Sequence, residues 1–431
     1  MNSKKKALFF PSFSGRGFGH IHRCLALANE LSLQDWQTGF VLAGPNSVLV
    51  KDKGYPLYQP QYIRHPSTKF TRSPAYSFIY NGNGQVLRDG LTRPWRVWLS
   101  VNESIRFVKH YHPDVLIGDS SLLTWIVGQR MQLPVVQIIQ SIIHPQNPQI
   151  IWWQEAPINE KPIDICPVFN PLLKHWNMNS IKQSEDLLKG DIFLIPGIPA
   201  TDPLPDWITN THYVGPLIVD QSQDFELPDP FNNPRGRPII FVTLGGSANP
   251  ELIENVYTTI GTTMSDSPCW VVMSVGGNFP TKELTEFSPN VFCFRWLPGW
   301  AAIQNSSAIV FHGGHTTMME TLIAGIPAVV IPSHSEQESN GRRLEACSAA
   351  VVISPSQDRE RMQLVHDTWS YGEFTSWIVP EFSPDPEELK KSIDKIIKDS
   401  AYQKGAQSLK NSALHYGGAK ASVELIKEIV T

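Results

Sequence analysis

Short apolar runs alternate with helix-length amphipathic segments along the first half of the chain. The runs are rich in β-branched and aromatic residues, and each ends near Gly, Pro, Ser or Asp, which predicts strands at 7–10, 39–42, 114–118, 135–139 and 191–195. The amphipathic segment 23–33 predicts the first crossover helix. This alternation indicates a parallel sheet covered by helices, the arrangement of an α/β protein.

A second series of strands starts at residue 238. It is predicted to cover 238–242, 270–273, 291–294, 308–311, 328–331 and 350–353. The stretch between the two series, 220–237, is polar and contains Pro228, Pro230 and Pro234, as expected for a linker. We therefore predict a first Rossmann-like domain over 1–219 and a second over 238–431, whose last helix could pack back on the first domain.

Two stretches, 63–98 and 141–176, show little periodicity and are rich in Pro, Asn and aromatic residues. Ligands of open α/β sheets bind beyond the carboxyl ends of strands, so both are candidates for an acceptor pocket. Surface loops packed by their own aromatic side chains remain an equal alternative. The lysines of the helical stretch 386–430 are interpreted as a solvated outer face.

Composition narrows the classes of function. Of the 431 residues, 41% are hydrophobic and 18% charged, as in globular proteins, and the net charge of −4 provides no basic field for nucleic acid. The five cysteines show no CxxC spacing, so neither a disulfide framework nor a zinc site is expected. Since no apolar run reaches about 18 residues, we expect a cytoplasmic protein without a membrane span; peripheral membrane contact stays open.

The stretch 312–320 carries the strongest chemical signal. It follows a predicted strand, turns at Gly313 and Gly314 and then enters a helix. Such a corner binds phosphates, because the glycines let the backbone approach and the helix N-terminus presents unpaired N–H groups. The hydroxyls of Thr316 and Thr317 can add hydrogen bonds. Taken alone, each feature also has a structural explanation as a turn, a helix cap or a charge in the first turn.

Polar residues also follow the strand predicted at 328–331. Glu336, Gln337 and Asn340 come shortly after Pro332. A carboxylate beside an amide can bind vicinal sugar hydroxyls.

From His312 to Asn340 the sequence resembles the donor-binding signature of the family 1 glycosyltransferases, the UDP-glycosyltransferases, HxGxxSxxExLxxGxPxxxxPxxxDQxxN. The matching residues are His312, Gly314, Thr317, Glu320, Leu322, Gly325, Pro327, Pro332, Glu336, Gln337 and Asn340. The resemblance implies a GT-B fold, in which two Rossmann-like domains turn parallel sheets towards a central cleft. It also implies that His312, Gly314, His315, Thr316, Thr317, Glu320, Glu336 and Gln337 hold a sugar nucleotide, with Glu320 on the ribose.

Two further segments are similar to the same family. Trp296 and Leu297 precede Pro298, as in the family's WxPQ motif, whose Trp stacks on the base. Gly299 replaces the Gln of that motif, which leaves UDP and dTDP donors both open. The segment 242–247 resembles the family's first turn of the second domain, which places Gly246 and Ser247 near the diphosphate.

A glycine-rich loop in the first half, 15–20, fits a dinucleotide fingerprint poorly, because His20 stands where the last Gly is required. It resembles instead the GHxxP/R loop of GT-B glycosyltransferases, with Gly19, His20 and Arg23 in place. The resemblance makes Gly19 a donor-binding residue and His20 a general base, with Asp119, which ends a predicted strand, as the partner of His20. Helix capping is the structural alternative for both residues.

The sequence thus predicts an inverting glycosyltransferase that moves a hexose from a UDP- or dTDP-sugar to a hydroxyl of a small or lipophilic acceptor, as in natural product glycosylation. A neutral imidazole has a pKa suited to removing the acceptor proton. No metal and no cofactor besides the donor is expected. A sugar-nucleotide 2-epimerase and a non-catalytic sugar-nucleotide-binding protein are the alternatives, and both monomer and homodimer are open.

Overall fold

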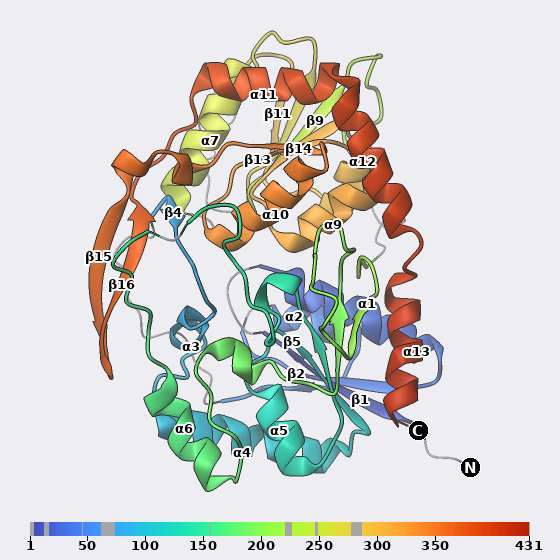
Figure 1. Cartoon of the computed structure of the whole chain (residues 1–431). Coiled ribbons are helices and arrows are strands. Elements are labelled where there is room, and N and C mark those ends of the chain that lie inside the picture. Colours follow the sequence, from blue (N-terminus) through green and yellow to red (C-terminus); the bar gives the residue numbers. More distant parts are fainter. Residues whose placement is uncertain are drawn as a thin grey trace.

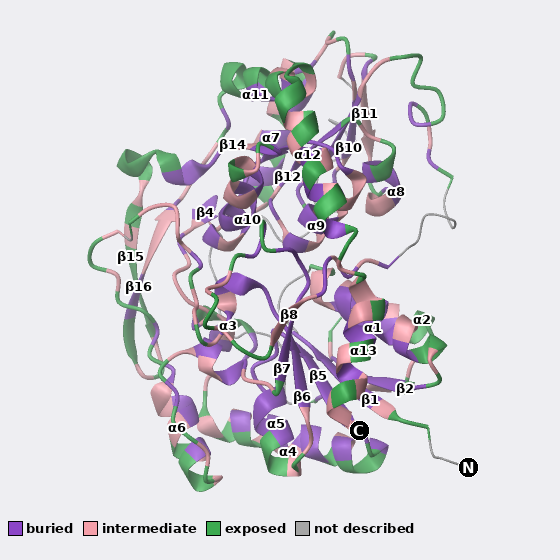
Figure 2. Ribbon diagram, turned by 45° about the vertical axis from the view of Figure 1, so that its right-hand side comes forward, coloured by how far each residue is buried: buried purple, intermediate pink, exposed green. Residues whose placement is uncertain are grey.

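The computed structural model describes residues 4–12, 17–44, 46–61, 74–155, 157–219, 226–245, 249–276 and 287–430. The chain forms two α/β halves, one below the other in Figure 1, each built around a parallel sheet. The predicted α/β class with parallel sheets is confirmed. Both sheets are buried, and exposed residues lie on the outer faces of the surrounding helices (Figure 2).

The first sheet has the strand order β3-β2-β1-β5-β6-β7-β8, and every described pairing in it is parallel. Its strands are β1 (Lys6–Pro11), β2 (Gln37–Val41), β3 (Leu57–Tyr58), β5 (Val115–Asp119), β6 (Val135–Ile138), β7 (Ile192–Ile195) and β8 (Thr211–Tyr213). The main helices around it are α1 (Gly19–Leu33), α4 (Pro94–Tyr111), α5 (Thr124–Met131) and α6 (Cys166–His175), with short α2 (Ser47–Asp52) and α3 (Gly84–Arg88). Its central strands are mostly apolar because both faces are covered, with Asp119 and Gln137 as buried polar exceptions.

The second sheet has the order β11-β10-β9-β12-β13-β14 and is again parallel. Its strands are β9 (Ile239–Thr243), β10 (Trp270–Ser274), β11 (Val291–Phe294), β12 (Ala308–Phe311), β13 (Ala328–Val330) and β14 (Ala350–Val352). Its helices are α7 (Pro250–Thr263), α8 (Gly299–Gln304), α9 (His315–Ala324), α10 (Ser335–Ala346), α11 (Pro386–Lys398) and α12 (Ser400–Ala413). Chain order reverses beside β1 and beside β9, and such switch points are where open α/β sheets bind ligands.

The last helix, α13 (Gly418–Val430), returns to the first half. It runs down beside α1 in Figure 1, and its Val423 and Ile426 join the core that contains Ile21 and Leu25. The C-terminal end of the chain therefore stabilises the N-terminal half by burying apolar surface.

A segment of the first half crosses in the opposite direction. The strand β4 (Tyr76–Ser77) pairs antiparallel with β16 (Gly372–Val379), which in turn pairs with β15 (Gln363–Trp369). The sequence did not predict this sheet, because β4 is two residues long and β15 is largely exposed and polar. Part of the stretch predicted as an acceptor loop thus belongs to a sheet shared by the two halves.

No helix among the described residues is long and apolar enough to cross a membrane.

Candidate active site

The turn between β12 and α9 forms the predicted phosphate-binding corner. Gly313 has a φ of +87°, and a Cβ there would collide with the carbonyl oxygen of Gln337, so a glycine is required. Gly314 is the N-cap of α9, and no side chain caps the first turn. The first N–H groups of α9 are therefore available to an anion, and the positive end of the helix dipole favours one there.

Several buried polar side-chain atoms around this corner have no hydrogen-bond partner among the described residues. They are His312 Nδ1, His315 Nε2, Thr316 Oγ1, His334 Nδ1 and Gln140 Oε1. A buried polar atom without a partner costs about 1–3 kcal/mol, so a polar ligand that bonds these atoms would recover that energy. Such a cluster indicates a ligand site.

Burial also sets the charge of the corner. It lowers the pKa of His312 to about 4, and the charge of His334 adds to the effect, so the His312 imidazole is neutral near pH 7. Burial raises the pKa of Glu320 to about 7, and this carboxyl forms no hydrogen bond with another described residue. The predicted ribose ligand is therefore half-ionised near neutral pH until a partner binds it.

The residues predicted to hold the sugar lie on α10, next to the corner. Asn340 Nδ2 donates to the carbonyl of Gly313 at 2.9 Å, which ties α10 to the turn. Gln337 Oε1 accepts from the backbone and hydroxyl of Ser333, which leaves its NH₂ group for a ligand. Burial alone would raise the pKa of Glu336, but the charge of His334 and a hydrogen bond from Gln140 hold it below its usual value.

Gln140 belongs to the first half, and its Nε2 reaches Glu336 Oε1 at 3.1 Å. Sequence reasoning missed this residue. A signal was present, since Gln140 directly follows a predicted strand, at the edge of the sheet where ligands bind.

His20 and Asp119 meet at the carboxyl edge of the first sheet. Asp119 ends β5, and His20 lies in the first turn of α1, which places His20 Nδ1 2.7 Å from Asp119 Oδ1. Asp119 does not cap α5, whose N-cap is Leu123. Burial alone would raise the pKa of Asp119, but the charges of Arg23 and His20 lower it, so this carboxylate is ionised.

The two halves of the site face each other closely. Arg23 Nη1 lies 3.5 Å from Nδ1 of His315, the first residue of α9. A Cβ on Gly19 would lie 2.7 Å from Thr316 Oγ1, so a glycine there allows α1 to approach α9. His315 Nε2 is also 3.8 Å from the buried carboxylate of Asp202, a residue that no sequence motif indicated. The candidate base and the phosphate-binding corner thus lie close to each other, where α1 of the first half meets α9 of the second.

The remaining predicted donor residues are placed differently. Trp296 is 63% exposed, and its contact with a base stays a prediction. Leu297 is buried in the core and its backbone N–H donates to Ser274 Oγ at 3.2 Å; its part in the donor site stays a prediction. Gly246 and Ser247 lie outside the described residues.

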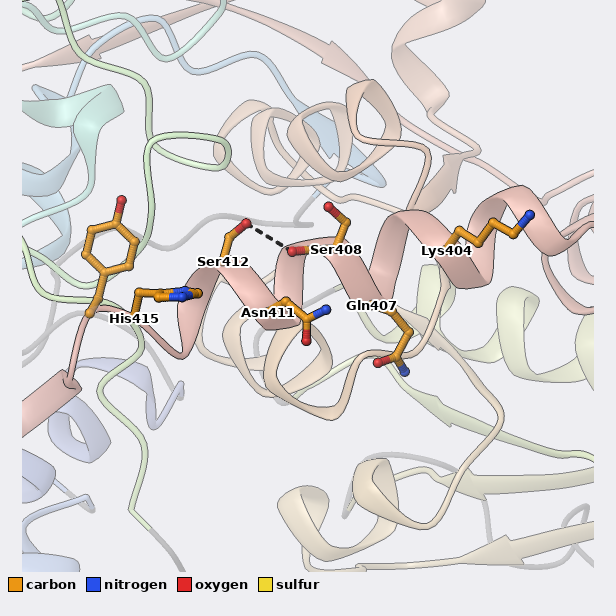
Figure 3. A pocket seen from close by; sticks show the side chains of 7 residues that line it. Lys404, Gln407, Ser408, Asn411, Ser412 and His415 are labelled. Atoms are coloured by element: carbon orange, nitrogen blue, oxygen red, sulfur yellow. Dashed lines mark hydrogen bonds between the residues drawn. The ribbon is translucent and has the colours of Figure 1, made fainter.

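A hollow of about 750 Å³ lies on the outer face of α12 (Figure 3). It is lined by Lys404, Gln407, Ser408, Asn411, Ser412, His415 and Tyr416. None of the predicted site residues lines it, so it is not the candidate site. Within the described ranges, no group of three or more His, Cys, Asp or Glu side chains is arranged to hold a metal ion.

Comparison with known proteins agrees with this geometry. The family model for UDP-glucoronosyl and UDP-glucosyl transferases matches residues 168–358. A PGL/p-HBAD biosynthesis glycosyltransferase of Mycobacterium tuberculosis is 26% identical over 286 residues, which is 61% of this chain and 63% of that protein. This chain therefore spans less than two thirds of that relative. An uncharacterized glycosyltransferase of Methanosarcina mazei is 25% identical over 426 residues, 96% of both chains.

Solved structures show the same fold. The glycosyltransferase of kitacinnamycin superposes with a TM-score of 0.73 at 16% identity over the whole of both chains. A spinosyn rhamnosyltransferase complexed with thymidine diphosphate superposes with a TM-score of 0.66 at 14% identity, covering 98% of this chain and all of that one. The predicted GT-B architecture is confirmed.

Proposed function

We propose that this chain, which has the GT-B fold and resembles the UDP-glycosyltransferases of family 1 over residues 168–358, transfers a hexose from a UDP- or dTDP-sugar to an acceptor hydroxyl, with inversion. The observation that carries this proposal is the cluster of buried polar atoms without a hydrogen-bond partner at the N-terminus of α9, next to Arg23 and its contact with His20. A nucleotide diphosphate supplies the charge and the acceptor oxygens that this cluster lacks.

In this proposal the diphosphate binds the first N–H groups of α9, with Thr316 and Thr317 donating hydroxyl hydrogens and neutral His312 beside them. The ribose diol donates to Glu320, and the hexose hydroxyls bind Glu336 and Gln337. These groups stabilise the charge that grows on the departing diphosphate.

The chemical step is one displacement. His20 Nε2 takes the proton of the acceptor hydroxyl as its oxygen attacks the anomeric carbon, and the bond from that carbon to the diphosphate oxygen breaks. Asp119 accepts from His20 Nδ1–H at 2.7 Å and stabilises the imidazolium that forms. Attack from the face opposite the leaving group inverts the anomeric configuration.

The test is a screen of UDP- and dTDP-sugars against phenolic, macrolide and lipid acceptors, read by mass spectrometry. We expect an acceptor product heavier by one hexose or deoxyhexose residue; deoxyhexoses are included because the spinosyn neighbour is a rhamnosyltransferase complexed with thymidine diphosphate. Conversion of UDP-GlcNAc to its 2-epimer without acceptor would support the epimerase instead. Nucleotide binding with no turnover in any combination would support a non-catalytic binding protein.

Donor affinity should depend on pH through Glu320. A ribose diol bonds the ionised carboxylate best, and the pKa of about 7 means that the free protein must lose a proton there as the donor binds. Ionisation is lost as the pH falls through 7, so the dissociation constant for UDP should rise about tenfold between about pH 8 and about pH 6. Isothermal calorimetry in buffers of different ionisation enthalpy measures both the affinity and the proton released.

The matched control is Glu320→Gln, which keeps the size of the side chain and cannot titrate. We expect weaker UDP binding with a smaller change over this pH range than in the parent, because the titration of Glu320 is removed while that of the terminal phosphate of UDP remains, and His312, with a pKa of about 4, stays neutral throughout. An unchanged dissociation constant in Glu320→Gln would remove Glu320 from the ribose site.

A further inference from the structure

Arg23 lies at the centre of the candidate site, between the His20–Asp119 pair and the start of α9. Its side chain is 4% exposed. Nε and Nη2 donate to the two carboxylate oxygens of Asp119 at 2.8 and 2.7 Å, and Nη2 also lies 2.9 Å from His20 Nδ1. Nη1 is directed to α9, 3.5 Å from His315 Nδ1.

His20 Nδ1 therefore has two neighbours with opposite requirements. Asp119 Oδ1, at 2.7 Å, is ionised and can only accept a hydrogen bond, whereas Arg23 Nη2, at 2.9 Å, can only donate one. In a neutral imidazole Nδ1 carries either a proton or a lone pair, so just one of these two interactions is a hydrogen bond at a given moment. Arg23 and Asp119 thus favour different tautomers of His20.

The two tautomers differ in what the other ring nitrogen can do. With the proton on Nδ1, bonded to Asp119, Nε2 has a free lone pair and can accept the proton of an acceptor hydroxyl. With Nδ1 accepting from Arg23, the proton is on Nε2, and the ring cannot act as a base there. A change that weakens the contact between Arg23 and His20 therefore favours the tautomer in which Nε2 can accept a proton.

The position of Arg23 Nη1 indicates which ligand could weaken the contact between Arg23 and His20. It lies beside the first turn of α9, 3.9 Å from where a Cβ on Gly19 would be, and so beside the corner at which the diphosphate is proposed to bind. Two negative charges placed there attract the guanidinium towards α9 and away from the imidazole. His20 Nδ1–H can then donate to Asp119 without competition from Arg23.

We propose that Arg23 is a positioning residue that makes the proton-accepting tautomer of His20 depend on a diphosphate bound at α9. This rests on the proposed function, because it presupposes a nucleotide diphosphate donor. The free protein holds a large share of His20 with the proton on Nε2, and the nucleotide shifts it to Nδ1. The base is thereby assembled when a donor is present to react.

The test is nitrogen NMR of the full-length protein labelled with ¹⁵N-histidine, titrated with UDP and with dTDP. The ¹⁵N shifts distinguish protonated from unprotonated ring nitrogens, His20 is assigned by its loss in His20→Asn, and His22, two residues along α1, is the internal control. We expect the proton of His20 to move from Nε2 to Nδ1 on saturation while His22 stays unchanged. Nucleotide binding with no change at His20 would overturn this inference and leave the proposed function intact; no binding of either nucleotide would count against the proposed function itself.

Arg23→Lys provides a second readout, since it keeps the charge but cannot span Asp119 and His20 together. We expect UDP affinity within about threefold of the parent, a His20 tautomer that no longer responds to UDP, and a kcat lowered by about tenfold or more with little change in donor KM. Exposed Arg106→Lys on α4 is the matched control and should change none of these values. A tautomer shift that persists in Arg23→Lys would overturn the role of Arg23, and if this variant does not fold, the titration of the parent protein decides alone.

Discussion

Replacement of His20 by alanine is expected to lower kcat for sugar transfer by about 10²- to 10⁴-fold, which corresponds to about 3–5 kcal/mol of activation free energy. In the proposed mechanism the imidazole takes the acceptor proton, and the buried carboxylate of Asp119 holds it in place. Its Nδ1 bonds Asp119, so the removal of the ring abolishes proton transfer without touching α9. Steady-state kinetics with a saturating donor measures kcat, and calorimetry with UDP or dTDP should give a nearly unchanged dissociation constant.

His22→Ala is the control for this experiment. His22 lies on the same helix, its ring stacks on Phe18 with 6.0 Å between centroids, and it does not contact the pair of His20 and Asp119. We expect its activity to stay within about twofold of the parent, because substitutions away from a special contact have small effects. Full activity in His20→Ala would exclude His20 as the base, whereas equal losses in both variants would indicate damage to α1.

Many residues of this site could be predicted because they lie close together in the sequence. Strands buried on both faces are mostly apolar, so the strands that position Asp119 and the α9 corner stand out from the helices between them. The glycines at 313 and 314 and the polar residues up to Asn340 lie within one short stretch of sequence, and a hydrogen bond from Asn340 to Gly313 brings its two ends together. Motifs whose residues are near neighbours in the sequence can therefore be recognised from the sequence alone.

Contacts between the halves could not be predicted in the same way. Gln140 reaches Glu336 over a sequence separation of 196 residues, and the contact between Arg23 and His315 spans 292. No periodicity or motif couples positions so far apart. The two-residue strand β4 is held by backbone pairing with β16, which any sequence can form, and it leaves no pattern of side chains to recognise.

These crossing segments connect the two halves of the chain on both sides of the candidate site. Ile79 N–H donates to Ser335 Oγ at 2.9 Å, and the backbone of Lys161 bonds that of Thr375, so the first half is joined to the second along one side. The helix α13 joins them again through the core around Ile426. Attachment at both sides favours a fixed spacing between His20 and α9, which a direct displacement needs because the reacting atoms must meet within about 3.5 Å.

Replacement of Glu338 by alanine should be the most destabilising change in this interface, with a loss of about 3–5 kcal/mol in the free energy of unfolding. Its fully buried carboxylate accepts from the Tyr76 hydroxyl at 2.6 Å and from the hydroxyls of Ser354 and Ser356 at 2.7 and 2.8 Å. It also pairs with Arg342 at 3.0 Å. Alanine leaves these donors without their shared acceptor, and a buried group without a partner costs far more than a lost surface contact.

Denaturant unfolding followed by fluorescence and circular dichroism measures this loss. Tyr76→Phe, which removes one hydroxyl of the network and keeps the ring, should cost about 1–2 kcal/mol. Glu424→Ala, which breaks an exposed pair with Lys427, should stay within about 0.5 kcal/mol of the parent. If Glu338→Ala lost no more than Glu424→Ala, the Tyr76 contact would not be what holds the first half against α10. A loss of about 1–2 kcal/mol in Tyr76→Phe would show that the crossing segment contributes to stability, because the hydroxyl of Tyr76 is the group of that segment that Glu338 binds.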